Sequence, residues 1–195
     1  EMMGIKPSFM HAMEGMPLPV LINAGIVLMS VGLLFKVAAA PFHFWAPDVY
    51  EGSPALTTAL MSTLAKVVAM ATLYKLLSVM NADISETYKM VIVAIAMASM
   101  TVGNIMALKQ TNVKRMLAFS GISHAGFMLM TLLSLANSAS SLLYYTTAYA
   151  LSGIAAFSVI LYVCKNQHNE DITNFHGLGK THPFLAAVLT ASLLS

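Results

Sequence analysis

The sequence predicts an all-α, polytopic membrane protein, a bundle of transmembrane helices. First, 58% of its 195 residues are hydrophobic and only 9% are charged, whereas soluble domains are about 25% charged. Second, apolar runs of the length that crosses a bilayer, about 20 residues, recur along the chain. Because lipid offers no partner to a backbone amide, such runs are expected to form helices.

Six apolar runs define the expected elements of a single membrane domain. They cover about residues 17–49 (broken), 54–77, 88–109, 115–135, 140–164 and 183–195 (cut off). The polar gaps between them are short, so consecutive helices are expected to be antiparallel neighbours. Because the chain opens abruptly at Glu1 and stops at Ser195 inside an apolar run, we expect it to be a piece of a longer protein.

The first run is too long for one straight span. Residues 16–47 would make about 48 Å of helix against about 30 Å of hydrocarbon. Pro41 lacks an N–H, clashes with the carbonyl of Val37 and disfavours a helical conformation at the preceding residue. We therefore expect a helix to about residues 36–38, an opened turn, and a short second helix around residues 42–49. Broken helices at membrane depth are typical of ion sites in transporters.

Two lysines, Lys36 and Lys66, lie inside apolar runs. An ammonium there costs several kcal/mol and usually has a function. Desolvation favours the neutral amine, which makes each lysine a candidate proton carrier, and His43, which titrates near neutral pH, is a candidate to pass the proton on. Ser62 and Thr63, one turn before Lys66, are expected to bond its amine or hold water beside it. The alternative is that Lys36 extends its amine to the membrane surface, and that His43 and Lys66 are structural groups bonded to backbone carbonyls.

Two polar stripes follow helical spacing. They comprise Tyr145, Tyr149 and Ser152 in the run 140–164, and Ser120, Ser123 and His124 in the run 115–135. The favoured interpretation is that these groups hydrogen-bond neighbouring helices. Because ionisable groups at membrane depth often mark proton paths, His124, Tyr149 and Ser152 are retained as accessory relay candidates.

Several classes of function are not indicated. A single cysteine, Cys164, excludes an internal disulfide and an all-cysteine iron–sulfur site. The net charge of +2 is too small to indicate nucleic-acid binding. His168, His176 and His182 lack metal-ligand spacing, so we expect neither a metal nor a cofactor site in this chain.

Loop charges predict an orientation. The loops 109–115 and 165–182 carry four lysines and the single arginine, whereas the opposite side has Lys6 and Lys89, with Lys75 near its helix end. The positive-inside bias therefore places these two loops on the cytoplasmic or matrix side. By alternation of the helices, the acidic turn 48–53 is expected on that side too.

Three segments resemble a known family. Residues 32–54 read GLLFKVAAAPFHFWAPDVYEGSP, residues 110–127 read QTNVKRMLAFSGISHAGF, and residues 171–184 read DITNFHGLGKTHPF. Phe-Lys, then Pro-Phe-His, then Trp-x-Pro-Asp-Val-Tyr-x-Gly-x-Pro resembles subunit N of proton-pumping NADH:quinone oxidoreductase (respiratory complex I). Its sister subunits L and M usually differ after the tryptophan. The resemblance extends from about residue 17 to residue 195.

The resemblance implies an antiporter-like fold with a chain of charged residues and water across the membrane centre. Lys36 matches the lysine of the family's broken helix, His43 its neighbour in the motif, and Lys66 the lysine of the next helix, so all three are implied as a proton relay. The family's acidic partner for Lys36 is expected upstream of Glu1, and a further lysine downstream of Ser195.

The function implied is that of a proton-translocating subunit of an enzyme complex, in a bacterial inner membrane, without redox chemistry of its own. NADH, flavin, iron–sulfur clusters and quinone are then expected elsewhere in the complex. Its partners would be the other membrane subunits and the lipid bilayer. Three alternatives stay open: a subunit of a cation/proton antiporter, the equivalent subunit of the ferredoxin-linked photosynthetic complex, and a scaffold in which the lysines are packed relics.

Overall fold

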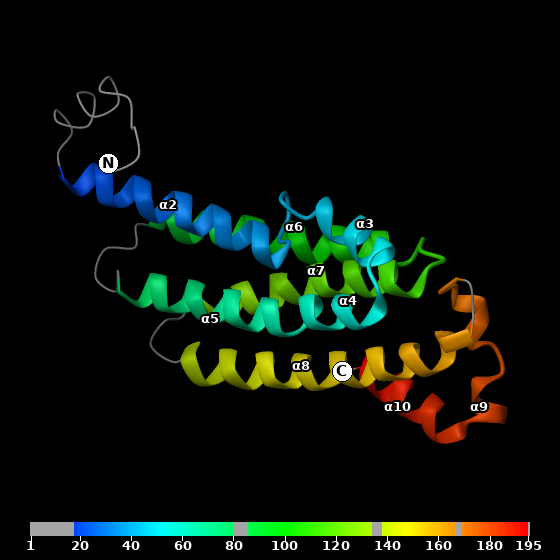
Figure 1. Cartoon of the computed structure of the whole chain (residues 1–195). Coiled ribbons are helices and arrows are strands. Elements are labelled where there is room, and N and C mark those ends of the chain that lie inside the picture. The colour runs from blue at the N-terminus through cyan, green and yellow to red at the C-terminus, as the bar shows by residue number, and fades with distance from the viewer. Residues whose placement is uncertain (1–17, 80–85, 134–137, 167–168, 195) are drawn as a thin grey trace, which may run out of the picture. The chain divides into compact units, whose positions relative to one another are not determined.

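The computed structural model describes residues 18–79, 86–133, 138–166 and 169–194, and within these ranges the chain is helical apart from its turns (Figure 1). The helices are α2 (Leu18–Val37), α3 (Trp45–Gly52), α4 (Ala55–Ser62), α5 (Leu64–Val79), α6 (Glu86–Ala107), α7 (Val113–Thr131), α8 (Ser138–Val163), η1 (Cys164–Asn166), η2 (Ile172–Phe175), α9 (Leu178–Thr181) and α10 (Pro183–Leu194). The predicted all-α class is confirmed. In the described part of the chain, strand-like pairing is limited to one bridge between Asn112 and Asp171.

The chain divides into two compact units. The described part of the first unit, residues 18–32, is the beginning of α2. The second unit starts at Leu33 and contains the end of α2 and all the later helices. Every candidate residue discussed below belongs to this second unit.

The distribution of polar and apolar side chains is inverted relative to a soluble protein. Lys66, Thr58 and Ser99 are at most 2% exposed, whereas Met90 and Leu143 are 72% and 66% exposed. Among the described helices, Ala55–Ser78, Tyr88–Ala107 and Ala139–Val163 are long and apolar enough to cross a membrane. Because exposed apolar side chains with buried polar ones suit a lipid solvent, the chain is an integral membrane protein.

The predicted break in the first helix is confirmed, but the second half lies further along the chain than expected. Helix α2 ends at Val37 and α3 begins at Trp45, while the expected second helix covered residues 42–49. Residues 38–44 form turns instead, closed by the Phe42 N–H, which donates to the Ala39 carbonyl at 2.7 Å.

The run expected as one helix over residues 54–77 is interrupted at Thr63, between α4 and α5. Thr63 has φ −101° and ψ −77°. The Ser62 and Thr63 hydroxyls both donate to the Ala59 carbonyl, at 3.0 and 2.7 Å. Hydroxyls that bond a carbonyl one turn earlier compete with the backbone ladder and bend helices. The interruption lies one turn before Lys66.

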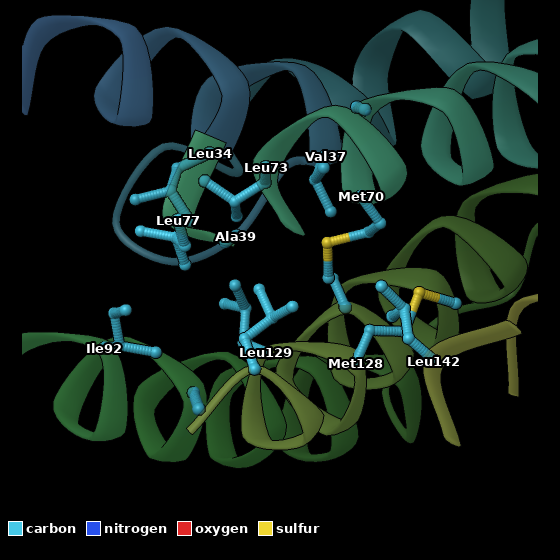
Figure 2. Close-up of a cluster of buried hydrophobic side chains, with 14 residues drawn as sticks. Leu34, Val37, Ala39, Met70, Leu73, Leu77, Ile92, Met128, Leu129 and Leu142 are labelled. Atoms are coloured by element: carbon cyan, nitrogen blue, oxygen red, sulfur yellow. The ribbon is translucent and has the colours of Figure 1, made fainter. Parts of the chain in front are cut away.

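Side chains from five helices meet in the main apolar cluster, shown in Figure 2. The labelled members are Leu34, Val37, Ala39, Met70, Leu73, Leu77, Ile92, Met128, Leu129 and Leu142. In lipid there is little hydrophobic gain on helix association, so van der Waals packing of such side chains is what holds the bundle together. The cluster therefore fixes the broken end of α2 against α5, α6, α7 and α8.

Helices α6 and α7 approach closely because glycines face the partner backbone. A Cβ added to Gly103 would meet the Ser123 amide nitrogen at 2.6 Å, and one added to Gly126 would meet the Ala96 carbonyl at 2.7 Å. Small residues permit this kind of contact between membrane helices. Neither glycine tolerates a side chain unless the two helices move apart.

Candidate functional site

The end of α2 is a Schellman motif closed by an alanine. The Ala39 N–H donates to the Leu34 carbonyl and the Ala38 N–H to the Phe35 carbonyl, both at 3.0 Å. Ala38 adopts φ +62°, the left-handed conformation that such a terminus requires and that glycine usually supplies. A non-glycine residue there costs about 1–2 kcal/mol. The Schellman motif therefore fixes a sharp change in chain direction immediately after Lys36.

Two side chains brace this turn from outside the helix. The Ala40 N–H donates to Ser99 Oγ of α6 at 2.8 Å, and the Ser99 hydroxyl in turn donates to the Ile95 carbonyl at 2.7 Å. The indole N–H of Trp45 donates to the Phe35 carbonyl at 2.9 Å, with the two rings stacked 5.7 Å apart. Backbone groups freed by the break are therefore satisfied locally, which keeps the break in one geometry.

The two candidates at the break have different surroundings. Lys36 is exposed on the described part of the chain, so its expected burial does not arise from contacts within this segment. His43 is 8% exposed, its ring lies 4.3 Å from that of Phe44, and its Nδ1 has no hydrogen-bond partner among the described residues. A buried ring nitrogen without a partner is uncommon and leaves His43 able to bind water or a proton.

Lys66 of α5 is the least exposed lysine among the described residues. It is 2% exposed, and its Nζ has no hydrogen-bond partner in the described part of the chain. Its Nζ lies over the ring of Tyr149 on α8, 5.8 Å from the ring centroid. Cation–π attraction of this kind offsets only about 1–2 kcal/mol, less than an unpaired ammonium costs at this depth.

A cavity of mixed polar and apolar lining shares Gly121 and Tyr149 with the surroundings of this amine, although Lys66 itself does not line it. Its volume is about 40 Å³, and it is lined by Ser62, Leu117, Ser120, Gly121, His124, Tyr149, Ser152, Gly153, Ala156, Phe157, Ser192 and Leu193. About 10–15 Å³ of such volume holds one water molecule, so the cavity has room for a few. The hydroxyls and the imidazole supply the polar partners that ordered water needs.

Aromatic and imidazole groups continue from the cavity. The rings of Tyr149 and His124 lie 5.2 Å apart, and His124 Nδ1 lies 2.8 Å from the Tyr145 hydroxyl. Whether the imidazole or the phenol donates this hydrogen bond depends on the tautomer of His124. The bond joins α7 to α8, as the helix-bonding interpretation of the two stripes predicts. Together with the contacts of Tyr149, this hydrogen bond completes a row of titratable groups that runs from Lys66 through Tyr149 and His124 to Tyr145.

Some expected contacts are absent. The Ser62 and Thr63 hydroxyls donate to the Ala59 carbonyl, and neither oxygen accepts from the amine of Lys66, which has no hydrogen-bond partner among the described residues. The expectation of a direct bond is therefore wrong. Ser152 donates to the Tyr149 carbonyl of its own helix at 3.1 Å. Oxygens of Ser62 and Ser152 nevertheless line the cavity, where their lone pairs can accept hydrogen bonds from water.

A second polar cluster lies at the ends of the helices, among the loops that the sequence analysis places on one side of the membrane. Lys114 is 3% exposed, and its Nζ donates to the Ser53 carbonyl at 2.6 Å and pairs with Glu170 at 2.7 Å. Arg115 pairs with Asp48 and Glu51, each at 2.7 Å. The three segments that carry the family resemblance therefore meet here, and the turn 48–53 shares its end of the bundle with loops 109–115 and 165–182.

Sequence reasoning missed three residues that shape these sites. Ser99 caps the break, Lys114 joins three segments, and Gly121 faces the amine of Lys66. A glycine three residues before His124 in a helix was the available signal for Gly121, because glycine weakens a helix and needs another reason to be there. Nothing in the local sequence distinguishes Ser99 from other serines.

The helical membrane fold, the broken helix and a buried lysine beside a polar cavity define an antiporter-like membrane subunit. Residues 6–195 match the family described as NADH:quinone oxidoreductase/Mrp antiporter, TM. The chain belongs to this family. It is 73% identical over 185 residues to NADH-quinone oxidoreductase subunit N of Flavobacterium johnsoniae, an alignment that covers 91% of this chain and 40% of that protein.

Solved structures agree with this assignment. A chain of the membrane-bound sulfane sulfur reductase, an archaeal respiratory membrane complex, matches with a TM-score of 0.80 at 27% identity, covering 91% of this chain and 37% of its own. A chain of respiratory complex I from Thermus thermophilus matches with a TM-score of 0.68 at 31% identity, covering 87% of this chain and 36% of its own. The chain thus spans about two-fifths of the length of such relatives.

Proposed function

We propose that this segment is part of the proton path in subunit N of an NADH:quinone oxidoreductase. The observation that carries the proposal is the amine of Lys66, which is 2% exposed and has no hydrogen-bond partner among the described residues. Its neighbours Gly121 and Tyr149 line a cavity of about 40 Å³ that also contains serine hydroxyls and His124. An amine in this position is costly as a fixed charge. It is well suited to take up and release a proton through the water that the cavity can hold.

The geometry supports an order for the groups. A proton on Lys66 reaches cavity water, then His124, whose Nδ1 is in hydrogen-bond contact with Tyr145. Tyr149, in contact with both Lys66 and His124, polarises the space between them. Each transfer changes the charge next to the following group and so changes its proton affinity, which couples the steps.

Lys36 and His43 form the entry to this row in our proposal. Lys36 lies at the end of the broken helix and is exposed on this segment, where another part of the full-length protein is expected to cover it. His43, buried with an unpartnered Nδ1, lies on the chain between Lys36 and the helix of Lys66. Redox cofactors and quinone belong to other subunits, which supply the driving force through contacts with this one.

The test is the Lys66→Met variant of the full-length protein in the assembled complex, reconstituted into vesicles. Methionine keeps most of the side-chain volume and removes the titratable group. We expect the complex to assemble and proton pumping per NADH oxidised to be abolished or sharply reduced, with the same outcome for Lys36→Met. Lys75→Met is the matched control, since Lys75 is an exposed lysine of the same helix. Normal pumping by an assembled Lys66→Met complex would refute the relay.

A scaffold role makes a different prediction. If the lysines only hold helices together, Lys66→Met lowers the amount of assembled complex but leaves the ratio of protons pumped to NADH oxidised unchanged. Measuring both quantities on the same membranes separates the two functions.

A further inference from the structure

We propose that Gly121 is a positioning residue for Lys66, because its missing side chain leaves the notch on α7 that receives the amine. A Cβ built on Gly121 overlaps Lys66 Nζ and lies 2.9 Å from the Tyr149 hydroxyl oxygen, while Lys66 Cε stays at an ordinary 3.7 Å. The Lys66 amine from α5 and the Tyr149 hydroxyl from α8 both approach the surface of α7 at Gly121.

The burial of the amine gives this notch its significance. Lys66 Nζ is enclosed and unpartnered in the described part of the chain, so no hydrogen bond determines where it sits. Among the described residues its position is limited by the surface of α7 at Gly121 and by the ring of Tyr149. Gly121 also lines the cavity, beside His124 on the next turn of the same helix. The notch therefore determines how closely the amine approaches the water and imidazole that follow it.

Gly121 differs in kind from the packing glycines of the same helix pair. At Gly103 and Gly126 an added Cβ would meet backbone atoms of the neighbouring helix, which can yield only if the helices separate. At Gly121 the added methyl would meet the ends of two flexible side chains. Gly121→Ala is thus expected to leave the helices in place and to displace the amine, whereas Gly103→Ala and Gly126→Ala disrupt packing.

The functional consequence rests on the proposed relay through Lys66. A reacting group misplaced by about 1 Å loses up to about a hundredfold in rate, so we expect about a tenfold loss of proton pumping in Gly121→Ala with normal assembly. Because the surroundings of the amine change, the pH profile of pumping should also shift. Gly103→Ala, which does not touch the amine, should reduce assembly without moving that profile.

The closing experiment adds a double-mutant cycle on the thermal stability of the assembled complex, using Gly121→Ala, Lys66→Met and the double variant. Methionine has no atom at the Nζ position, so the stability loss caused by Gly121→Ala should be clearly smaller in the Lys66→Met background. It does not vanish, because the contact with Tyr149 remains. Such coupling is the expected sign of direct contact between two positions.

The outcomes separate this inference from the relay on which it builds. If Gly121→Ala pumps normally with an unmoved pH profile while Lys66→Met does not pump, the positioning role is wrong and the relay stands. If Lys66→Met pumps normally, the relay is wrong. The notch is then judged by the thermal cycle alone: equal stability losses in the two backgrounds overturn it, and a smaller loss with methionine supports it.

Discussion

Replacing Lys114 by methionine should loosen the point where three distant segments of the chain meet. Lys114 lies in the first turn of α7, where the helix dipole disfavours a cation, yet its side chain is only 3% exposed. Its Nζ satisfies the Ser53 carbonyl at 2.6 Å and the carboxylate of Glu170 at 2.7 Å. The substitution leaves both acceptors without this donor while the methionine stem keeps most of the packing.

The magnitude follows from these exposures. Breaking a fully buried ion pair costs about 3–5 kcal/mol, and orphaning a buried carbonyl costs about 1–3 kcal/mol. Because the side chain of Glu170 is 24% exposed and keeps some water, we expect a local destabilisation of about 2–4 kcal/mol. At 1.4 kcal/mol per tenfold, local opening should become about 30- to 700-fold more frequent.

Hydrogen exchange on the intact complex measures this opening. The Val113 N–H donates to the Glu170 carbonyl and the Ile172 N–H to the Thr111 carbonyl, both at 2.9 Å, so these amides report on the cluster. Arg115→Met is the matched control: its side chain is 33% exposed and its partners more so. Exposed pairs contribute about 0–1 kcal/mol, so exchange should rise at most about fivefold. Equal exchange rates in the two variants would refute the reasoning.

Three further predictions concern single side chains. Ser99→Ala removes the acceptor of the Ala40 N–H and should lower the free energy of unfolding by about 1–3 kcal/mol. The thermal midpoint of the complex should fall accordingly, and an unchanged midpoint would show that the cap is dispensable. Ala38→Val forces a branched residue into φ +62° at a fully buried position and should destabilise the fold by about 2 kcal/mol or more. Ala38→Gly should keep the amount of assembled complex near normal, and similar assembly of both variants would contradict this reasoning. Burial, and next the nearby Glu170 carboxylate, raise the pKa of the Cys164 thiol, so less reactive thiolate exists at neutral pH. Its maleimide labelling rate should keep rising beyond pH 9 and increase at pH 8 in Glu170→Gln; a plateau below pH 8 would disprove the shift.

Local chemistry in the sequence predicted several features correctly. Pro41, together with a span too long for the bilayer, indicated the break that the structure places after Val37. Composition and run lengths indicated the membrane class. Alternation of the helices placed the turn 48–53 on the same side as the loops 109–115 and 165–182, and contacts of Lys114 and Arg115 bring them together. Each of these depends on properties of contiguous residues.

Other expectations failed where neighbouring hydroxyls had a choice of partner. Ser62 and Thr63 were expected to face the amine of Lys66, but they bond the Ala59 carbonyl and interrupt their own helix. A hydroxyl can donate to a carbonyl one turn earlier and still accept from an amine, so helical spacing alone does not show which contacts form. Lys66 directs its amine toward Gly121 and Tyr149 instead.

The sequence by itself determined that this chain is a helical membrane protein and where its first helix breaks. These follow from length, hydropathy and proline, which act within one segment. Only the tertiary structure decided what Lys66 faces: the notch at Gly121, the ring of Tyr149 and the cavity that reaches His124. That outcome depends on how α5, α7 and α8 are rotated and spaced against one another. Close packing of complementary surfaces sets this arrangement, and a hydropathy pattern does not encode it.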